Sequence, residues 1–544
     1  MPLQIDDSKA THIFLPQPKE SRLCPGCGEE MRYYYKSSGR YYFRLSGLTY
    51  LAGQIVYCHN GACPLRFKPM HPPEELRQVQ PRKGHGFDVL ARVGQLRYGE
   101  ELTRLEIKTR LQKDHPALVI SERQVQTLYE FYGALVSGST LTDPDVIAKI
   151  KANKCMVLSF DGGKPLRDND SVWFVRDLLT GTTLAALAMT SCTTEALVEL
   201  LTPIKAFARR HNTPVIAIVS DKEAKNLAAA RRVFPKARHQ YCQVHYVGNL
   251  ADPVAKADRE LRNDVKEAMR GKVGEIEKAI KKDTGSKKSL KPDEGEVLLD
   301  LCVGIRCLLR RNGKQPYHPP GIRLVKDLLE LRESVRQMKL ERGGAHYQAL
   351  EDLLSLAERF QTRKYEIQRF YDDIWSVGEI LFSEGQTKKG AKRLLLKLRK
   401  TWERRLLHPE CEEDIKAEPV LSKWCEQTDS YWPGLFHCYG DYRIPGSNND
   451  IERFIKDMKQ LVRVLSRNPN PAVRFITHAA TNALLATRPV LPDEKTLASY
   501  SAEAMREATR QLQERRRAMG IQQQVRRSPH RFGEACLNRL RQCS

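Results

Sequence analysis

Two short segments, 155–163 (CMVLSFDGG) and 215–223 (VIAIVSDKE), constrain the fold of this chain more than any other feature. Each is a run of apolar residues typical of a buried β-strand, and each run stops at an aspartate, Asp161 or Asp221. An unpaired carboxylate is costly to bury at the end of a core strand. The pattern therefore predicts that both acids have a role at the edge of a sheet.

The segments around these strands follow a characteristic order. After the first strand come a hairpin at 171–191 and an amphipathic helix at 193–212. A second strand followed by a helix occupies 215–234, and a short strand is expected at 239–247. The hairpin has Thr180 and Gly181 at its turn. The order strand, strand, strand, helix, strand, helix, strand is that of the ribonuclease-H-like fold, in which the first and fourth strands are neighbours. Asp161 and Asp221 are therefore expected at one rim.

Two like charges at one rim repel each other, and a divalent cation relieves the repulsion. Mg²⁺ prefers hard oxygen ligands, and a pair of such ions supports phosphodiester chemistry. We expect the third carboxylate to be Glu452, on the first turn of a helix that follows the polar residues Asn448 and Asn449. The site would hold two Mg²⁺ or Mn²⁺ ions. Asp450 and Glu223 are the rival ligands.

Four sequence blocks around these acids resemble the bacterial, insertion-sequence kind of Mutator-type DDE transposase. They are LSFDGG, IVSDKEAKN, HQYCQVHYVGNL and NNDIERFIKDMKQLVRV. The resemblance covers residues 150–250 and 440–480 and implies a large helical insertion between the second aspartate and the glutamate. It also implies that Cys242, His245 and Asn449 lie near the active site. The N-terminal cysteine pairs and the segment after the glutamate helix depart from the family pattern.

Two residues cannot close a zinc shell, which needs four ligands. His437 and Cys438 are the available partners for Cys242 and His245. The favoured interpretation is instead that His245 contacts DNA or orients Asp221, while Cys242 packs in the core.

Two cysteine pairs near the N-terminus predict a structural zinc site. Cys24 and Cys27 form a CPGC knuckle, and Cys58 and Cys63 form a looser second pair about thirty residues later. Four thiolates suffice for tetrahedral zinc, and the tyrosine-rich segments between them suit a zinc ribbon. His59 is a substitute ligand.

Residues 84–140 carry apolar positions at helical spacing, and the third helix opens with a capping box at Ser121 and Gln124. Two short helices and a capped third predict a helix-turn-helix, whose last helix presents polar residues to DNA. These residues are Glu122, Arg123, Gln124 and Gln126. A generic three-helix packing domain is the alternative.

The fold class predicted is a multidomain α/β protein with seven regions. They are a flexible leader (1–20), a zinc-ribbon-like domain (21–80), a helix-turn-helix domain (84–140), the first part of a ribonuclease-H-like core (150–250), an all-α insertion (251–435), the second part of the core with the glutamate (436–495), and a basic C-terminal helix and tail (496–544). Trp402 and Trp432 in the insertion are candidates for base stacking, with core packing as the alternative. Arg453, Lys456 and Lys459 are expected to bind phosphates.

Charge and composition restrict the partners. The formal net charge is +24, which suits a polyanion such as double-stranded DNA. No apolar run approaches the length of a membrane span and no signal peptide is visible, so we expect no membrane partner. Most of the 14 cysteines are scattered, which fits a reducing compartment. The expected location is the cytoplasm, on the nucleoid, in a bacterium, or the nucleus in a eukaryote.

The sequence thus predicts a DNA transposase that binds element ends, cuts with water and joins the freed 3′-hydroxyl to target DNA. Because two ends must be joined, a homo-oligomer of at least two subunits on DNA is expected. One alternative is a domesticated DNA-binding regulator that has lost catalysis. A second is a ribonuclease-H-like nuclease without strand transfer.

Overall fold

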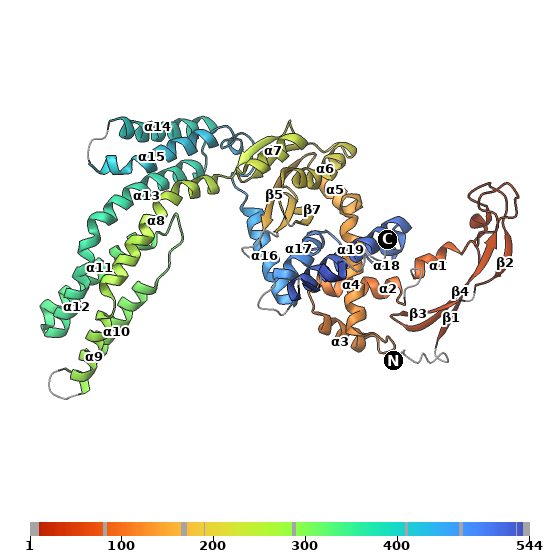
Figure 1. Ribbon diagram of the computed structural model, residues 1–544, viewed down its shortest axis with the longest axis horizontal. Helices are drawn as coiled ribbons and strands as arrows, with labels where there is room; N and C mark the ends of the chain where they lie inside the picture. Colours follow the sequence, from red (N-terminus) through yellow and green to blue (C-terminus); the bar gives the residue numbers. More distant parts are fainter. Residues whose placement is uncertain are drawn as a thin grey trace. The chain divides into compact units, whose positions relative to one another are not determined.

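The computed structural model describes residues 10–536 apart from short gaps. These gaps fall at residues 38, 80–83, 165–170, 190, 286–289, 409–411, 467–471, 529 and 532. The start of the expected leader and the end of the expected tail lie outside the described residues. Two compact units divide the chain (Figure 1). The first unit is Met1–Ile216, Ala228–Ala237 and Asn449–Ser544, and the second is Ala217–Leu227 and Arg238–Asn448.

The N-terminal part of the first unit is a four-stranded sheet built on one long strand. Its strands are β1 (Thr11–Leu15), β2 (Arg32–Lys36), β3 (Arg40–Arg44) and β4 (Gly47–Tyr57). β1 pairs with β4 in parallel, and β2 and β3 pair with it antiparallel. The pairing of β1 departs from the flexible leader expected here. Its cause is the alternation of Ile13 and Leu15, which pack against buried Tyr42 and Leu51.

Helices follow this sheet after the short helix α1 (Pro73–Gln78). They are α2 (Phe87–Gly94), the π-helical turn η3 (Gln95–Gly99), α3 (Arg104–Asp114) and α4 (Glu122–Gly138), and α5 (Pro144–Ala152) leads on to the next sheet. The capping box predicted at the start of α4 is confirmed: Gln124 N–H donates to Ser121 Oγ at 3.3 Å, and Ser121 N–H donates to Gln124 Oε1 at 2.8 Å. An apolar core that includes Val93, Ile107 and Val125 joins α2, α3 and α4.

Three antiparallel strands form the second sheet of the first unit. They are β5 (Met156–Gly163), β6 (Ser171–Asp177) and β7 (Thr182–Met189). The predicted hairpin turn is confirmed, since Gly181 has a φ of 67° and buried Asp177 accepts hydrogen bonds from Thr180 N–H and Oγ1 at 3.1 and 2.7 Å. Two helices, α16 (Asn449–Ser466) and α17 (Ala472–Ala486), share an apolar core with β6.

The remaining elements of the first unit are helices. They are α6 (Thr194–Arg210), α18 (Glu494–Ser499) and the basic α19 (Ala502–Arg527). Helix α7 (Ala224–Val233) is divided, with residues 224–227 assigned to the second unit and 228–233 to the first. α4 packs on α17 and α19, so the N-terminal helices and the C-terminal part of the chain share a core.

Strand β8 (Val215–Ser220) begins in the first unit and continues into the second, where it pairs in parallel with β9 (Arg238–Tyr241). The strand predicted over 239–247 is therefore too long. It ends at Tyr241, and helix α8 begins at Gln243. The reason is the spacing of the next apolar residues, because Tyr246, Val247 and Leu250 lie on one buried helical face.

The second unit is otherwise helical, as its sequence predicts. Its helices are α8 (Gln243–Met269), α9 (Lys272–Gly285), α10 (Pro292–Arg310), α11 (Pro320–Arg342), α12 (Ala345–Ser355), α13 (Gln361–Phe382), α14 (Lys388–Leu407) and α15 (Glu412–Tyr431). α8 lies along α11 and α13 (Figure 1). One continuous core runs through these helices and contains the buried rings of Trp402 and Trp424. No helix in the described parts of the chain is long and apolar enough to cross a membrane.

The two ends of this helical segment meet. Tyr241 N–H donates to Gly434 O at 2.8 Å, and Gln243 N–H donates to Gly446 O at 2.8 Å. A Cβ atom at position 434 would lie 2.6 Å from the Tyr241 ring, so the close approach requires glycine. The chain thus leaves β9 and returns to the same place.

A buried carboxylate on α8 caps the start of α11. The helix begins at Pro320 without a capping side chain of its own. Asp258, which is fully buried, accepts hydrogen bonds from Ile322 N–H at 2.9 Å and from Gln315 Nε2 at 3.1 Å. This side chain therefore ties α8 to α11 inside the core.

Replacing this carboxylate should destabilise the second unit. Asp258→Ala leaves the Ile322 N–H buried without an acceptor, so the free energy of unfolding should fall by about 2 kcal/mol or more. Urea unfolding followed by circular dichroism measures the change. Asp264→Ala is the matched control, because Asp264 lies on the same helix and forms an exposed pair with Arg363. Asp264→Ala should lower the free energy of unfolding by less than about 1 kcal/mol. Equal losses in the two variants would contradict the capping role.

Candidate active site

Asp161 lies on β5, and the strand continues past it through two glycines. Its carboxylate accepts a hydrogen bond from Gly162 N–H at 2.7 Å. The glycines allow close packing on both sides. A Cβ at Gly162 would lie 2.7 Å from the Trp173 ring, and one at Gly163 would lie 2.9 Å from Ile455 on α16. β5 therefore has no side chain at Gly163, the position where α16 packs against it.

Glu452 lies on the first turn of α16, as predicted, and is partly buried. It precedes Ile455 by three residues, so the two side chains lie on one face of the helix. Because Ile455 packs on Gly163, two residues beyond Asp161, the first turn of α16 sits at the end of β5 that carries the aspartate. The first unit thus brings two of the three predicted acids to one region.

The start of α16 is anchored to β6 by a buried arginine. Arg176, which is 6% exposed, donates from Nε to Asp450 Oδ1 at 3.0 Å and from Nη1 to Thr183 Oγ1 at 3.2 Å. Its guanidinium also stacks on Phe454 at 4.0 Å. Asp450, a rival metal ligand in the sequence, is engaged in this ion pair. No sequence pattern pointed to Arg176, since its partner is 274 residues away.

In the second unit, Asp221 follows β8 and is held by two donors. His245 Nδ1 lies 2.9 Å from Asp221 Oδ1, and Asn448 Nδ2 donates to the same oxygen at 2.9 Å. The hydrogen bond with Asp221 is the main cause that raises the pKa of His245 to about 11. The shift favours a protonated imidazole beside the aspartate, and the expected role of His245 in orienting Asp221 stays a prediction.

The resemblance to the family pointed to Asn449, and the donor to Asp221 is its neighbour Asn448, which is fully buried. Both residues belong to the polar pair seen before the glutamate helix. The sequence indicates that the Asn448–Asn449 pair lies near Asp221. Which of the two amides donates to Asp221 depends on the backbone path into α16, and the sequence does not show that path.

Cys242 and His245 stand at the start of α8 rather than on a strand. Cys242 is fully buried, and its N–H donates to Ser220 O at 3.1 Å. Cys438, one of the possible zinc partners, contacts Gln243 Nε2 at 3.3 Å. Among the described residues, Cys438 and His437 form no cluster of metal ligands with this pair. The Cys242 thiol also interacts with His245 and helps to raise the pKa of that imidazole, so core packing as its sole role stays a prediction.

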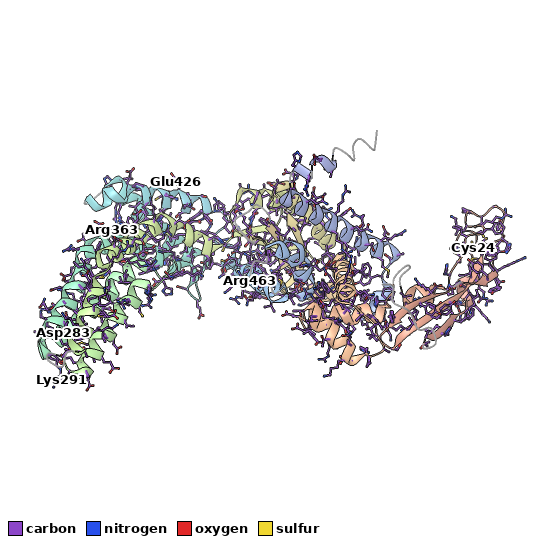
Figure 2. All side chains as sticks on the ribbon, turned by 60° about the horizontal axis from the view of Figure 1, so that its bottom comes forward. Cys24, Asp283, Lys291, Arg363, Glu426 and Arg463 are labelled. Atoms are coloured by element: carbon purple, nitrogen blue, oxygen red, sulfur yellow. The ribbon has the colours of Figure 1, made fainter. Side chains whose placement is uncertain are left out.

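The N-terminal cysteines gather into one cluster. The sulfur atoms of Cys24, Cys27, Cys58 and Cys63 all lie within 4.8 Å of one another, with 3.6 Å between Cys24 and Cys63 and 3.5 Å between Cys27 and Cys58. A Zn–S bond of about 2.3 Å in a tetrahedron separates the sulfurs by about 3.8 Å, so the cluster fits zinc. Figure 2 shows Cys24 at one end of the N-terminal sheet.

The backbone prepares one of these thiols for metal binding. Hydrogen bonding from the Gly26 backbone is the largest cause that lowers the pKa of Cys24 to about 7. Burial, in contrast, raises the pKa of Cys58 to about 12. A bound cation would favour the thiolate form of both.

The residues expected to read DNA have protein partners in this structure. Gln126 accepts a hydrogen bond from Arg104 at 3.0 Å and donates to Glu130 at 2.7 Å, and Gln124 is occupied by the capping box. Arg123 lies on the first turn of α4. A cavity of about 290 Å³ separates α3 and α4 from α16 and α17; among its lining residues are Arg97, Arg104, Glu122, Gln126, His478 and Asn482.

The phosphate-binding candidates and the tryptophans differ in exposure. Arg453 and Lys456 are exposed on α16, and Lys459 is partly buried beside Phe475. Trp402 is fully buried and donates to Asp373 Oδ2 at 3.1 Å, so its ring is not open to a base. The alternative role, core packing, describes it. Trp432 is partly buried against Phe436.

Zinc content tests the cysteine cluster. Purified protein should contain one zinc ion per chain by mass spectrometry of its metals, and Cys63→Ser should lose it because three thiolates leave the shell open. His59→Ala is the control. Its ring stacks on Tyr57 at 4.3 Å and is not part of the sulfur cluster, so this variant should keep its zinc. Zinc loss from His59→Ala with retention in Cys63→Ser would contradict the assignment.

Comparison with known proteins bears on the segment around Asp221. Residues 196–282 match the family model described as Transposase, Mutator family. No curated protein matches the chain. The matched segment includes Asp221, Cys242 and His245, three of the residues whose motifs carry the resemblance. This match, which covers residues 196–282, supports the resemblance of the chain to Mutator-type transposases.

Proposed function

We propose that the protein cuts and joins DNA at a site formed by Asp161, Asp221 and Glu452. The observation that carries the proposal is the packing of α16 on β5, because it seats the glutamate helix beside the aspartate strand. The family match at residues 196–282 supports it, since this segment contains Asp221.

The start of β8 supports the proposed position of Asp221 beside Asp161. Met156 N–H, at the start of β5, donates to Pro214 O, just before β8, at 2.9 Å. In a parallel ladder this bond sets Met156 opposite Val215. Continued in register, as the ribonuclease-H-like order requires, the ladder sets Asp161 opposite Ser220, one residue before Asp221. Both acids would then leave the sheet at the same rim.

The donor set suits divalent cations. Three carboxylates offer hard oxygen ligands, and Mg²⁺ or Mn²⁺ would supply activation of the attacking oxygen and stabilisation of the leaving one. The protein's own residues position the ligands. His245 and Asn448 hold one oxygen of Asp221, leaving its other oxygen for a cation. Arg176 fixes the turn that carries Glu452.

The same geometry serves both chemical steps. Water first cuts the strand, and the freed 3′-hydroxyl then attacks target DNA in a second in-line displacement. Exposed Arg453 and Lys456, on the helix of Glu452, would bind the phosphates beside the cut. Because both ends of an element must react together, the active form would be an oligomer of at least two chains on double-stranded DNA. The zinc domain and α2–α4 would hold the element ends.

Loss of one acid should abolish the reaction. Asp161→Asn, Asp221→Asn and Glu452→Gln should each lower cleavage by more than about a hundredfold, since even an outer partner of a metal ligand costs 10–100-fold. The assay uses labelled duplexes that carry the DNA sequences on either side of the gene, with Mg²⁺ or Mn²⁺. Gel analysis separates nicked from joined products.

Glu223→Gln is the matched control, because Glu223 is an exposed acid that pairs with Lys225 at 2.9 Å. It should cleave at the rate of the unaltered protein. Activity retained in Asp161→Asn would remove the site. Nicked products without joined ones would favour a nuclease, and specific end binding without either product would favour a regulator.

The amide next to Asp221 should tune metal binding. Asn448→Ala removes a donor that orients the carboxylate, so the Mg²⁺ concentration for half-maximal cleavage should rise about tenfold or more. Asn449→Ala, which changes the next residue, at the start of α16, should change this concentration much less. A larger effect at Asn449 would contradict the geometry and support the family-based assignment.

A further inference from the structure

The N-terminal sheet carries a surface of exposed aromatic rings near the zinc cluster. Tyr33, Tyr34 and Tyr35 of β2 are 58%, 57% and 41% exposed, and Phe67 is 56% exposed. Large apolar side chains gathered on a surface mark a binding site more often than isolated ones do. Neither the cutting reaction nor the zinc site uses these rings.

A β-bulge places the tyrosines together. The register between β2 and β4 shifts between Tyr33 and Tyr35, which leaves Tyr34 as the extra residue. Neighbouring side chains of a regular strand point to opposite faces, and a bulge changes that direction. As a result, the rings of Tyr34 and Tyr35 touch edge to face, with 4.6 Å between centroids.

The rings form a continuous row across two segments of chain. Tyr34 contacts Tyr57 at 4.4 Å, and Tyr57 in turn contacts His59 at 4.3 Å and Phe67 at 5.5 Å. Tyr57 is held on β4, directly before Cys58 of the cysteine cluster, so the strand and the cluster fix the middle of the row. The aromatic row, as we call Tyr34, Tyr35, Tyr57, His59 and Phe67, is thus a rigid surface rather than a set of loose side chains.

Positive charge surrounds the aromatic row. Arg32 and Lys36 flank the tyrosines on exposed β2, Arg66 lies over the Phe67 ring at 4.6 Å, and Lys68 follows. The sequence has no aspartate or glutamate between Glu30 and Glu74. The surface therefore combines flat rings with several flanking cations, and one exposed acid, Glu29, lies beside it and accepts a hydrogen bond from Asn60 Nδ2 at 2.8 Å.

We propose that the aromatic row binds single-stranded DNA by stacking on its unpaired bases. Aromatic side chains stack on any base, and the surrounding cations bind the backbone phosphates. The bases of an intact duplex hide their faces in the helix, so a duplex cannot use the rings. A protein partner would have no need of the cationic border. The site is separate from the three carboxylates and does not depend on the proposed cutting reaction.

Binding of three probes by the full-length protein tests this inference. The probes are fluorescein-labelled oligo-dT, an abasic strand of the same length and a duplex of the same length, measured by fluorescence anisotropy at fixed salt. Oligo-dT should bind about tenfold or more tightly than the abasic strand, because stacking is lost without bases. Equal affinity for the two strands would overturn the proposal.

Variants locate the site. Tyr34→Ala should weaken oligo-dT binding about fivefold or more and leave duplex binding unchanged, and Tyr34→Trp should restore it. Arg66→Gln should lower the salt dependence of oligo-dT binding. Tyr442→Ala is the control, since Tyr442 is a 97% exposed tyrosine of the second unit. Zinc content confirms that each variant folds.

Three results would overturn the proposal. The first is oligo-dT binding that Tyr34→Ala leaves unchanged. The second is an equal loss of duplex binding in this variant, which would assign the rings to duplex ends. The third is a fall in oligomer mass by light scattering with unchanged affinity for DNA, which would assign the row to contacts between copies of this chain.

Discussion

A helix approaches a strand closely only where the strand has no side chain in the way, and β5 meets this condition at Gly163. The packing of Ile455 on that glycine determines which part of α16 lies against β5. Glu452, three residues earlier on the same helix, is placed by this contact. A larger side chain at Gly163 would push the helix outward and carry the glutamate with it. The candidate chemistry thus depends on an apolar contact that touches no reacting atom.

A second set of contacts places positively charged side chains beside Asp450 and Asp221. Arg176 neutralises Asp450, and His245 carries a positive charge against Asp221. Asp161, Asp221 and Asp450 therefore each have a fixed partner or a backbone donor before any cation arrives. Such preorganisation matters because carboxylates that swing freely would have to be ordered during the reaction.

Local patterns predicted most of the elements. The strands that end near Asp161 and Asp221, the hairpin turn and the capping box of α4 all follow from short-range rules, and the structure contains them. The cysteine spacing likewise predicted a cluster that the fold brings together. These features succeed because each is set by residues close in sequence.

Contacts over long sequence distances could not be predicted in this way. Arg176 finds Asp450 across 274 residues, and Asn448 rather than Asn449 reaches Asp221 across 227. The bulge at Tyr34 depends on how β2 pairs with β4, which alternation alone does not reveal. Trp402 could not be assigned to the core or the surface until the packing of α14 was known. The convergence of the three carboxylates is still a proposal.

The meeting of Tyr241 with Gly434 has a consequence for how such a chain evolves. Two backbone hydrogen bonds close the base of the helical segment, and they involve no residue of its distant helices. Since closing a loop costs free energy that grows only slowly with its length, the part of the segment beyond the first turn of α8, which carries His245, can grow or shrink at little cost to the rest of the fold. The helical segment is in this sense a replaceable cassette, and its size is free to diverge while the strands at its root stay constant.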